Sequence, residues 1–230
     1  MTRGILIAGN ESSLFSAAAA EALKRVEAFA SALIPNRFPL PEGGGALPVR
    51  TENAGGAIPL SWNPASSISA RTLVLAAENR LERINNAIIV CSPPAVFRAA
   101  EALTPEEIEI LVSDHIKGWF FLIRELILYF RRSGTGSLSL VVPEIVSGGR
   151  ETSVNVPADL LGPSALASFR AFAQGILASQ AGEPFQTMGF ATTEAGDEGN
   201  FAAWFFKIID EEARRNSGRW HKYSKLKLFR

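Results

Sequence analysis

The chain has 230 residues, a length that fits one domain with a sizeable core. Its 23 basic and 23 acidic residues cancel, and its single cysteine, Cys91, excludes an internal disulfide. Arg124 and Glu125 interrupt the longest apolar run, Trp119–Phe130, and the cysteine and two histidines are scattered. We therefore expect a cytoplasmic protein with no metal site, no nucleic-acid partner and no membrane segment.

The first half of the chain alternates short apolar runs with amphipathic segments. Ile5–Ala8, followed by Gly9, predicts a strand, and the Ala-rich stretch Ser13–Val26 predicts a helix. Phe29–Ile34 predicts a second strand, after which residues 35–56 form an irregular Pro/Gly-rich excursion. Beyond this excursion we expect a strand at 57–60, a helix at 66–83 and a buried strand at 87–91.

The second half contains the clearest helix start. Thr104 is a good N-cap, Pro105 suits the first helical position, and Glu107 completes a capping box for a helix over 104–131. The alternation of strands and helices predicts a single α/β domain over residues 1–230, with a doubly wound, mostly parallel, Rossmann-like sheet in three α/β/α layers. The remaining predicted elements are a strand at 136–142, a helix at 163–178, a strand at 185–188, a helix at 201–213 and a strand at 222–229.

Four short motifs follow one another in an order typical of one protein family. They are Leu103–Glu107 at the helix start, Asp114–Phe120 within that helix, Arg131–Leu138 at the turn into the next strand, and Arg215–Arg219 before the last strand. In this order and spacing the chain resembles the short-chain dehydrogenase/reductase family along nearly its whole length. The resemblance implies the fold of that family. It also implies an enzyme that binds NAD or NADP and oxidises alcohols or reduces carbonyls.

The catalytic residues of that family are not retained at the matching positions. The resemblance implies an Asn, a Ser, a Tyr acid/base and a Lys that lowers the pKa of the Tyr. The Asn position falls on His115, the Ser position on or near Pro143, the Tyr position on about Pro163 and the Lys position on about Ala167. We therefore predict no catalytic residue at these positions.

The first turn also departs from the family's glycine-rich pattern. Gly9 is retained, but the second and third glycines fall on Ser13 and Phe15. Glu11 would place a negative charge near a pyrophosphate, and the Phe15 ring would oppose close approach of the backbone. We expect no cofactor, although Arg37, after the second strand, is where family members that prefer NADP often carry an Arg.

Tyr223 and Lys227 show the bare spacing of the family's Tyr and Lys. They lie in a segment predicted as a strand, where four residues span about 13 Å, whereas one helical turn separates such side chains by about 6 Å. We interpret the match as coincidental.

Three further candidates have ordinary explanations. His115 lies on an apolar helical stripe and is read as a core or interface residue, and Cys91 as a small buried apolar group. In the basic C-terminal tail, charged residues alternate with apolar ones, a pattern typical of an edge strand. Its charged residues are Arg214, Arg215, Arg219, Lys222, Lys225, Lys227 and Arg230.

Two functions remain open. The first is a non-catalytic homologue, or pseudoenzyme, that acts as a structural or regulatory subunit or binds a ligand other than a dinucleotide. The alternative is an NAD(P)-dependent oxidoreductase with an atypical active site.

The two long helices predict an oligomer. The helix at 104–131 contains the consecutive apolar residues Trp119–Ile123, more than one buried stripe needs, and the helix at 163–178 places Phe169 and Phe172 among small residues. We expect self-association, or association with a homologous dehydrogenase subunit, through these helices.

Overall fold

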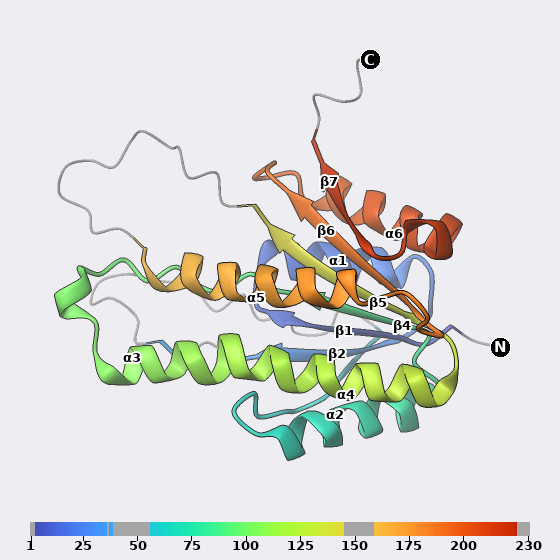
Figure 1. Cartoon of the computed structure of the whole chain (residues 1–230), viewed down its shortest axis with the longest axis horizontal. Helices are drawn as coiled ribbons and strands as arrows, with labels where there is room; N and C mark the ends of the chain where they lie inside the picture. The colour runs from blue at the N-terminus through green and yellow to red at the C-terminus, as the bar shows by residue number, and fades with distance from the viewer. Residues whose placement is uncertain (1–2, 36, 39–55, 145–158, 225–230) are drawn as a thin grey trace.

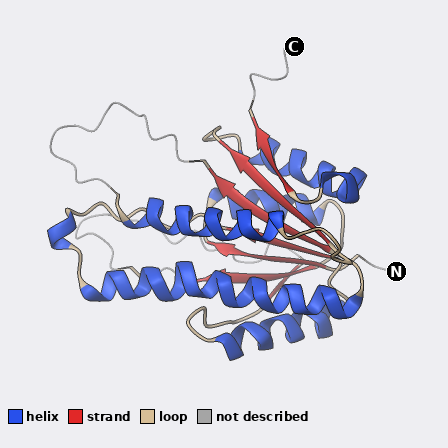
Figure 2. Cartoon of the chain, in the orientation of Figure 1, coloured by secondary structure: helices blue, strands red, loops and turns tan. Residues whose placement is uncertain are grey.

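The computed structural model describes residues 3–35, 37–38, 56–144 and 159–224. Within these ranges, seven parallel strands form one sheet in the order β3-β2-β1-β4-β5-β6-β7 (Figures 1 and 2). The order reverses between β1 and β4, which is the switch point at which doubly wound sheets bind ligands. The strands are β1 (Ile5–Asn10), β2 (Phe29–Ile34), β3 (Ala57–Pro59), β4 (Asn86–Val90), β5 (Ser137–Pro143), β6 (Gln186–Thr192) and β7 (Arg219–Tyr223).

Helices cover both faces of this sheet, so the predicted three-layer α/β fold is confirmed (Figure 1). Successive residues of a strand point to opposite faces. In β1, Leu6 and Ala8 pack in one core, whereas Ile5 and Ile7 pack in the other. The first core is covered by α2 (Ser67–Leu81), α4 (Gly118–Ser133) and α5 (Leu161–Ala178), and the second by α1 (Ser13–Leu23) and α6 (Glu198–Asn216).

The predicted capping box is present. The Thr104 side chain accepts a hydrogen bond from the Glu107 backbone N–H at 3.2 Å, and the Glu107 carboxylate accepts one from the Thr104 N–H at 2.9 Å. Together they satisfy two of the backbone donors that a helix start leaves free. The box fixes where α3 (Pro105–Ile110) begins.

The helix predicted over 104–131 is helical throughout, but it is not one regular α-helix. Between α3 and α4 the chain forms a π-helical segment, η2 (Leu111–Lys117), and α4 then continues to Ser133. At the end of η2, Gly118 lies against Pro64, and a Cβ on Gly118 would be only 2.6 Å from the Pro64 Cβ. π-Helical turns are rare and frequently mark functional positions.

Two strand predictions near the C-terminus need correction. β6 extends to Thr192 instead of ending at Met188, because Gly189 is not a turn but leaves room for the Trp220 ring. A Cβ on Gly189 would lie 2.5 Å from that ring. β7 begins at Arg219 and not at Lys222, directly after Gly218 with its φ of +79°. Most of the 35–56 excursion and residues 225–229 lie outside the described residues.

Candidate functional site

The carboxyl ends of β1 and β4 are joined by one side chain, that of Asn10. Its Oδ1 accepts a hydrogen bond from the Ser92 backbone N–H at 3.0 Å, so its amide nitrogen is the donor to His115 Nδ1, also at 3.0 Å. His115 comes from η2, and the contact places it at the switch point of the sheet. Because Nδ1 accepts, the ring proton lies on Nε2.

His115 is almost completely enclosed, with 1% of its surface exposed. The pKa of its ring is lowered from 6.5 to about 4, because burial disfavours the charged form; the Asp114 carboxylate opposes this shift, and the Arg37 charge adds to it. Its Nε2 has no hydrogen-bond partner among the described residues. The ring is therefore neutral at pH 7 and carries a buried N–H on Nε2.

Arg37 and Phe38 follow β2 and bind the same π-helical segment. The Arg37 guanidinium makes two hydrogen bonds to the Asp114 carboxylate, Nε to Oδ2 at 2.8 Å and Nη2 to Oδ1 at 2.6 Å. Phe38 stacks on His115 with ring centroids 5.6 Å apart. We call these two residues, with Asp114 and His115, the switch-point latch.

The latch also reaches the first turn of α5. Phe38 is 8% exposed and belongs to a buried apolar cluster with Ile110 and Leu111 of the long helix and with Leu161 and Ala165 of α5. Leu161 and Ala165 flank Pro163, the residue at about which the resemblance predicts the family's Tyr position. The region beside that position is thus filled with apolar side chains.

The turn between β1 and α1 is closed by its own residues. The Ser12 side chain caps the helix by accepting a hydrogen bond from the Phe15 N–H at 3.1 Å. Phe15 is buried against Gly9, and a Cβ on Gly9 would lie 2.7 Å from the Phe15 ring. Glu11 and Ser13 are exposed on the rim of the turn.

The other family positions carry no acid or base. Pro143 is the last residue of β5, and Pro163 and Ala167 lie in the first two turns of α5. None of these side chains has an ionisable group. The structure therefore brings His115 close to this end of the sheet, where neither Pro163 nor Ala167 can donate a proton from its side chain.

Tyr223 is the last residue of β7, as its strand prediction requires, and Lys227 lies outside the described residues. The Tyr223 hydroxyl donates a hydrogen bond to Asp197 Oδ2 at 2.8 Å. Burial and the Asp197 carboxylate raise the pKa of Tyr223 to about 12. A general acid/base needs a shift in the opposite direction, so the environment of Tyr223 does not activate it.

The remaining candidates take the structural roles expected of them. Cys91 is fully buried, and burial raises the pKa of its thiol, which disfavours the nucleophilic thiolate. In β7, Lys222 pairs with Glu144 at 3.0 Å. No group of three or more metal-binding side chains occurs in the described ranges. None of the helices seen there is long and apolar enough to span a bilayer.

Sequence reasoning did not single out Asn10, Phe38 or Asp114. Asn10 was accessible in principle, because the residue that ends β1 lies at the switch point. Phe38 and Asp114 had no local signal, since their partners are distant in the sequence.

No protein-family model matches the sequence, and no curated protein matches it. Solved structures do match. A 3-ketoacyl-(acyl-carrier-protein) reductase from Brucella melitensis, complexed with NADH, superposes with a TM-score of 0.71 at 14% identity, covering 96% of each chain. The chain has the short-chain dehydrogenase/reductase fold.

Two further structures agree with this assignment. A short-chain dehydrogenase from Mycobacterium smegmatis gives a TM-score of 0.69 at 13% identity over 97% of this chain and 92% of its own. One from Bacillus anthracis gives 0.70 at 11% identity over 96% and 95%. The dehydrogenase fold predicted from the sequence is thus confirmed, at identities that speak for the fold alone.

Proposed function

We propose that this dehydrogenase-fold chain is a non-catalytic homologue, which acts as a structural or regulatory subunit or holds a ligand other than a dinucleotide. The observation that carries the proposal is the switch-point latch. Arg37 and Phe38 lie where a doubly wound sheet opens its ligand crevice, and both are engaged by Asp114 and His115.

The residues present do not fit NAD or NADP as this fold would hold them. A pyrophosphate needs free backbone N–H groups at the start of α1. Here the Phe15 N–H already donates a hydrogen bond to the Ser12 side chain, and the Phe15 ring fills the space beside Gly9. Arg37, the candidate for a 2′-phosphate, already neutralises the buried Asp114 carboxylate.

The described residues of the candidate site also offer no route for a hydride-coupled proton transfer. By the resemblance, the family's Tyr and Lys positions fall on about Pro163 and about Ala167, and its Ser position falls on or near Pro143. Tyr223 holds its proton tightly because burial and the Asp197 carboxylate raise its pKa, and the low pKa of His115 keeps the imidazole ring neutral. A neutral, enclosed imidazole is a poor acid at pH 7.

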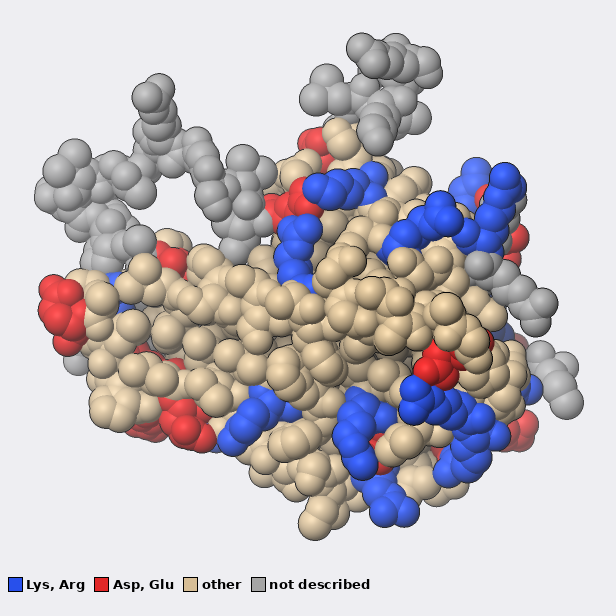
Figure 3. Space-filling model, viewed as in Figure 1, with Lys and Arg blue, Asp and Glu red and all other residues tan. Residues whose placement is uncertain are grey.

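A subunit role is supported by the outer face of α4 and α5. Over these helices the visible surface is mostly tan, so few Lys, Arg, Asp or Glu side chains lie there (Figure 3). The Phe120 and Phe172 rings meet there with centroids 4.0 Å apart, so the two helices present one continuous apolar face. A groove of about 550 Å³ on this face is lined by Phe120, Phe121, Arg124, Ile127, Leu128, Arg131, Phe172 and Ile176.

We propose that a second chain with this fold covers this apolar face, either another copy of this protein or a homologous subunit. A two-fold axis would place the same helices of both chains against each other. Trp119 does not belong to the face, because it is fully buried in the core beneath it.

The catalytic part of the proposal is tested by turnover. We expect purified protein, incubated with NADPH or NADH and a panel of ketones and aldehydes, to oxidise no cofactor above the rate in buffer. Should activity appear, Tyr223→Phe and Lys227→Met decide its origin. Turnover above the rate in buffer would itself contradict the proposal, and its loss by orders of magnitude in either folded variant would show that the tail is catalytic.

The alternative is an NAD(P)-dependent oxidoreductase with an atypical site. It is favoured by one observation, the unpartnered Nε2–H of His115 at the switch point, which could orient a carbonyl oxygen. Under this alternative, His115→Gln would abolish turnover while leaving the fold intact. Under our proposal there is no turnover to abolish.

A further inference from the structure

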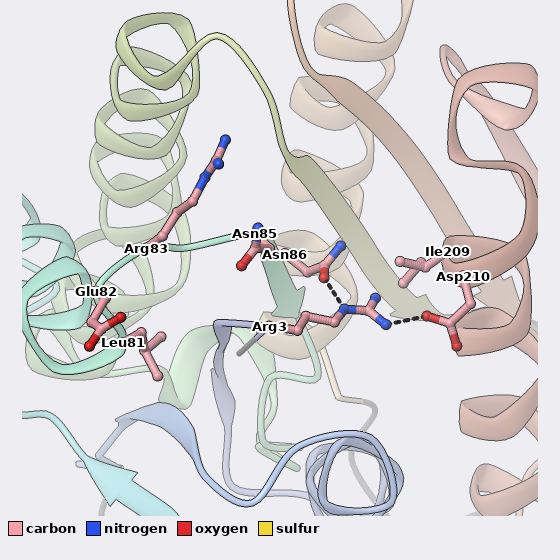
Figure 4. A pocket seen from close by; sticks show the side chains of 8 residues that line it. All are labelled: Arg3, Leu81, Glu82, Arg83, Asn85, Asn86, Ile209 and Asp210. Atoms are coloured by element: carbon pink, nitrogen blue, oxygen red, sulfur yellow. Dashed lines mark hydrogen bonds and ion pairs between the residues drawn. The ribbon is translucent and has the colours of Figure 1, made fainter. Parts of the chain in front are cut away.

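A cavity of about 670 Å³ lies at the amino edge of the sheet, away from the switch point. This volume is typical of small-molecule sites. It lies where β1 and β4 begin, beside α6 and the end of α2 (Figure 4). The lining residues are Arg3, Leu81, Glu82, Arg83, Asn85, Asn86, Ile209 and Asp210.

One wall of the cavity is electrically balanced. Arg3 Nε donates a hydrogen bond to Asn86 Oδ1 at 2.5 Å, and its guanidinium pairs with the Asp210 carboxylate. Asp210 also accepts from Arg25 Nε at 2.7 Å. Arg3 and Asp210 thereby hold each other in place, and neither charge needs a ligand.

The opposite wall carries a cation without a counter-ion. The half-buried Arg83 side chain makes no ion pair or hydrogen bond with any described residue. It extends away from the neighbouring Glu82 (Figure 4). Nearby, Asn85 uses its Oδ1 to accept from the Gly4 N–H at 2.8 Å, and its amide N–H groups bind no described residue. Removing a charge from water without a partner is unfavourable, so an anion at this wall would lower the free energy.

The backbone that presents Arg83 is strained. Glu82 has a φ of +61° and is the one described non-glycine residue with a positive φ. Such conformations cost free energy and persist where the surroundings impose them, often at ligand sites. Here the conformation turns the chain sharply at the end of α2 and directs Arg83 and Glu82 to different sides.

We propose that this cavity binds a small organic monocarboxylate. Arg83 and the Asn85 amide would hold the carboxylate, and Leu81 and Ile209 would contact a short apolar body. A single unpaired cation matches a single negative charge, whereas the Asp210 and Glu82 carboxylates nearby disfavour a dianion. The site is at the opposite edge of the sheet from the latch and does not depend on the proposed function.

Binding can be tested by nuclear magnetic resonance titration of the full chain with sodium hexanoate. We expect saturable shifts of the Asn85 side-chain amide and of the backbone amides of residues 81–86. In Arg83→Gln the dissociation constant should rise about tenfold or more, the loss expected for a charge-assisted hydrogen bond. Arg80→Gln is the matched control, because Arg80 is exposed in the last turn of α2, close to Arg83 in the sequence, and does not line the cavity.

Two further probes fix the chemistry of the ligand. Hexan-1-ol has the same apolar body without charge, and hexyl phosphate carries a second negative charge; both should bind more weakly than hexanoate. The proposal is overturned if millimolar hexanoate gives no saturable shift, if Arg80→Gln weakens binding as much as Arg83→Gln, or if either probe binds as tightly as hexanoate.

Discussion

Arg37 and Asp114 are 77 residues apart in the sequence and form a two-point ion pair at the carboxyl edge of the sheet. The Asp114 side chain is fully buried, whereas 49% of the Arg37 side chain is exposed. The pair holds Arg37, which follows β2, against η2. The next described residue, Phe38, packs in the apolar cluster beside α5.

Removing Arg37 should therefore destabilise the fold more than an ordinary surface substitution. Arg37→Ala leaves the buried carboxylate unpaired, and we expect a loss of about 2 kcal/mol in the free energy of unfolding by urea denaturation. The double variant Arg37→Ala/Asp114→Asn should lose less free energy of unfolding than the two single variants lose when their losses are added. Lys207→Ala, at an exposed pair with Glu211 on α6, is the control and should cost less than about 0.5 kcal/mol. Equal costs for Arg37→Ala and Lys207→Ala would contradict the role of the latch.

His115 should make stability depend on pH in a defined window. Its pKa is about 4 in the folded chain and 6.5 when exposed, so the unfolded chain binds more protons between these values. The stabilisation that comes from keeping His115 neutral in the folded chain is complete above pH 6.5, and it is lost as the pH falls from 6.5 towards 4. Between pH 7.5 and pH 5 we expect a loss on the order of 2 kcal/mol, which His115→Gln should abolish. If wild type and variant lose the same stability, the ring is not buried in its neutral form.

The strain at Glu82 predicts a stabilising substitution. Glycine adopts a positive φ without steric cost, so Glu82→Gly should raise the free energy of unfolding by about 1 kcal/mol. Glu82→Ala keeps the strain while removing the charge and should bring no such gain. Thermal unfolding of the two variants separates the relief of backbone strain from the removal of the Glu82 charge. If Glu82→Ala stabilises the chain as much as Glu82→Gly does, the gain comes from removing the charge and not from relieving the strain.

The apolar face of α4 and α5 predicts an assembly that charge should break. We expect light scattering at micromolar concentration to show a dimer or tetramer, which Phe120→Glu/Phe172→Glu converts to a monomer. Ile68→Glu, at a residue 77% exposed on α2, should leave the mass unchanged. A wild-type protein that is a soluble monomer on its own would contradict self-association. If that monomer forms a larger complex only when a homologous dehydrogenase is added, the assembly is a mixed one.

The predictions that came true rest on local signals. Thr104, Pro105 and Glu107 specify a helix start by their own chemistry, and the alternation of apolar runs specifies the layered sheet. The buried faces of the long helix were harder to assign, because the π-helical turn shifts the helical phase between Ile108 and Trp119. As a result Trp119 is a core residue, while Phe120 and Phe121 are partly exposed.

The candidate site was less accessible to sequence reasoning than the fold. The sequence predicts, from position along the chain, that the family's second and third glycines and its Tyr and Lys are replaced. The contacts that replace them could not be predicted, because Phe38 meets His115 and Arg37 meets Asp114 only after β2 and the long helix are placed by the sheet. Side chains that pair over such distances leave no periodic pattern.

The central claim, that the latch and the closed turn exclude a dinucleotide, is tested most directly by calorimetric titration of the wild-type chain with NADH and NADPH. We predict no binding in the micromolar range for either cofactor. Arg37→Ala/Phe38→Ala should remain without binding, because Phe15 and Ser12 still close the phosphate turn. Micromolar binding of NADH or NADPH to the wild-type protein would contradict this account and favour the oxidoreductase alternative.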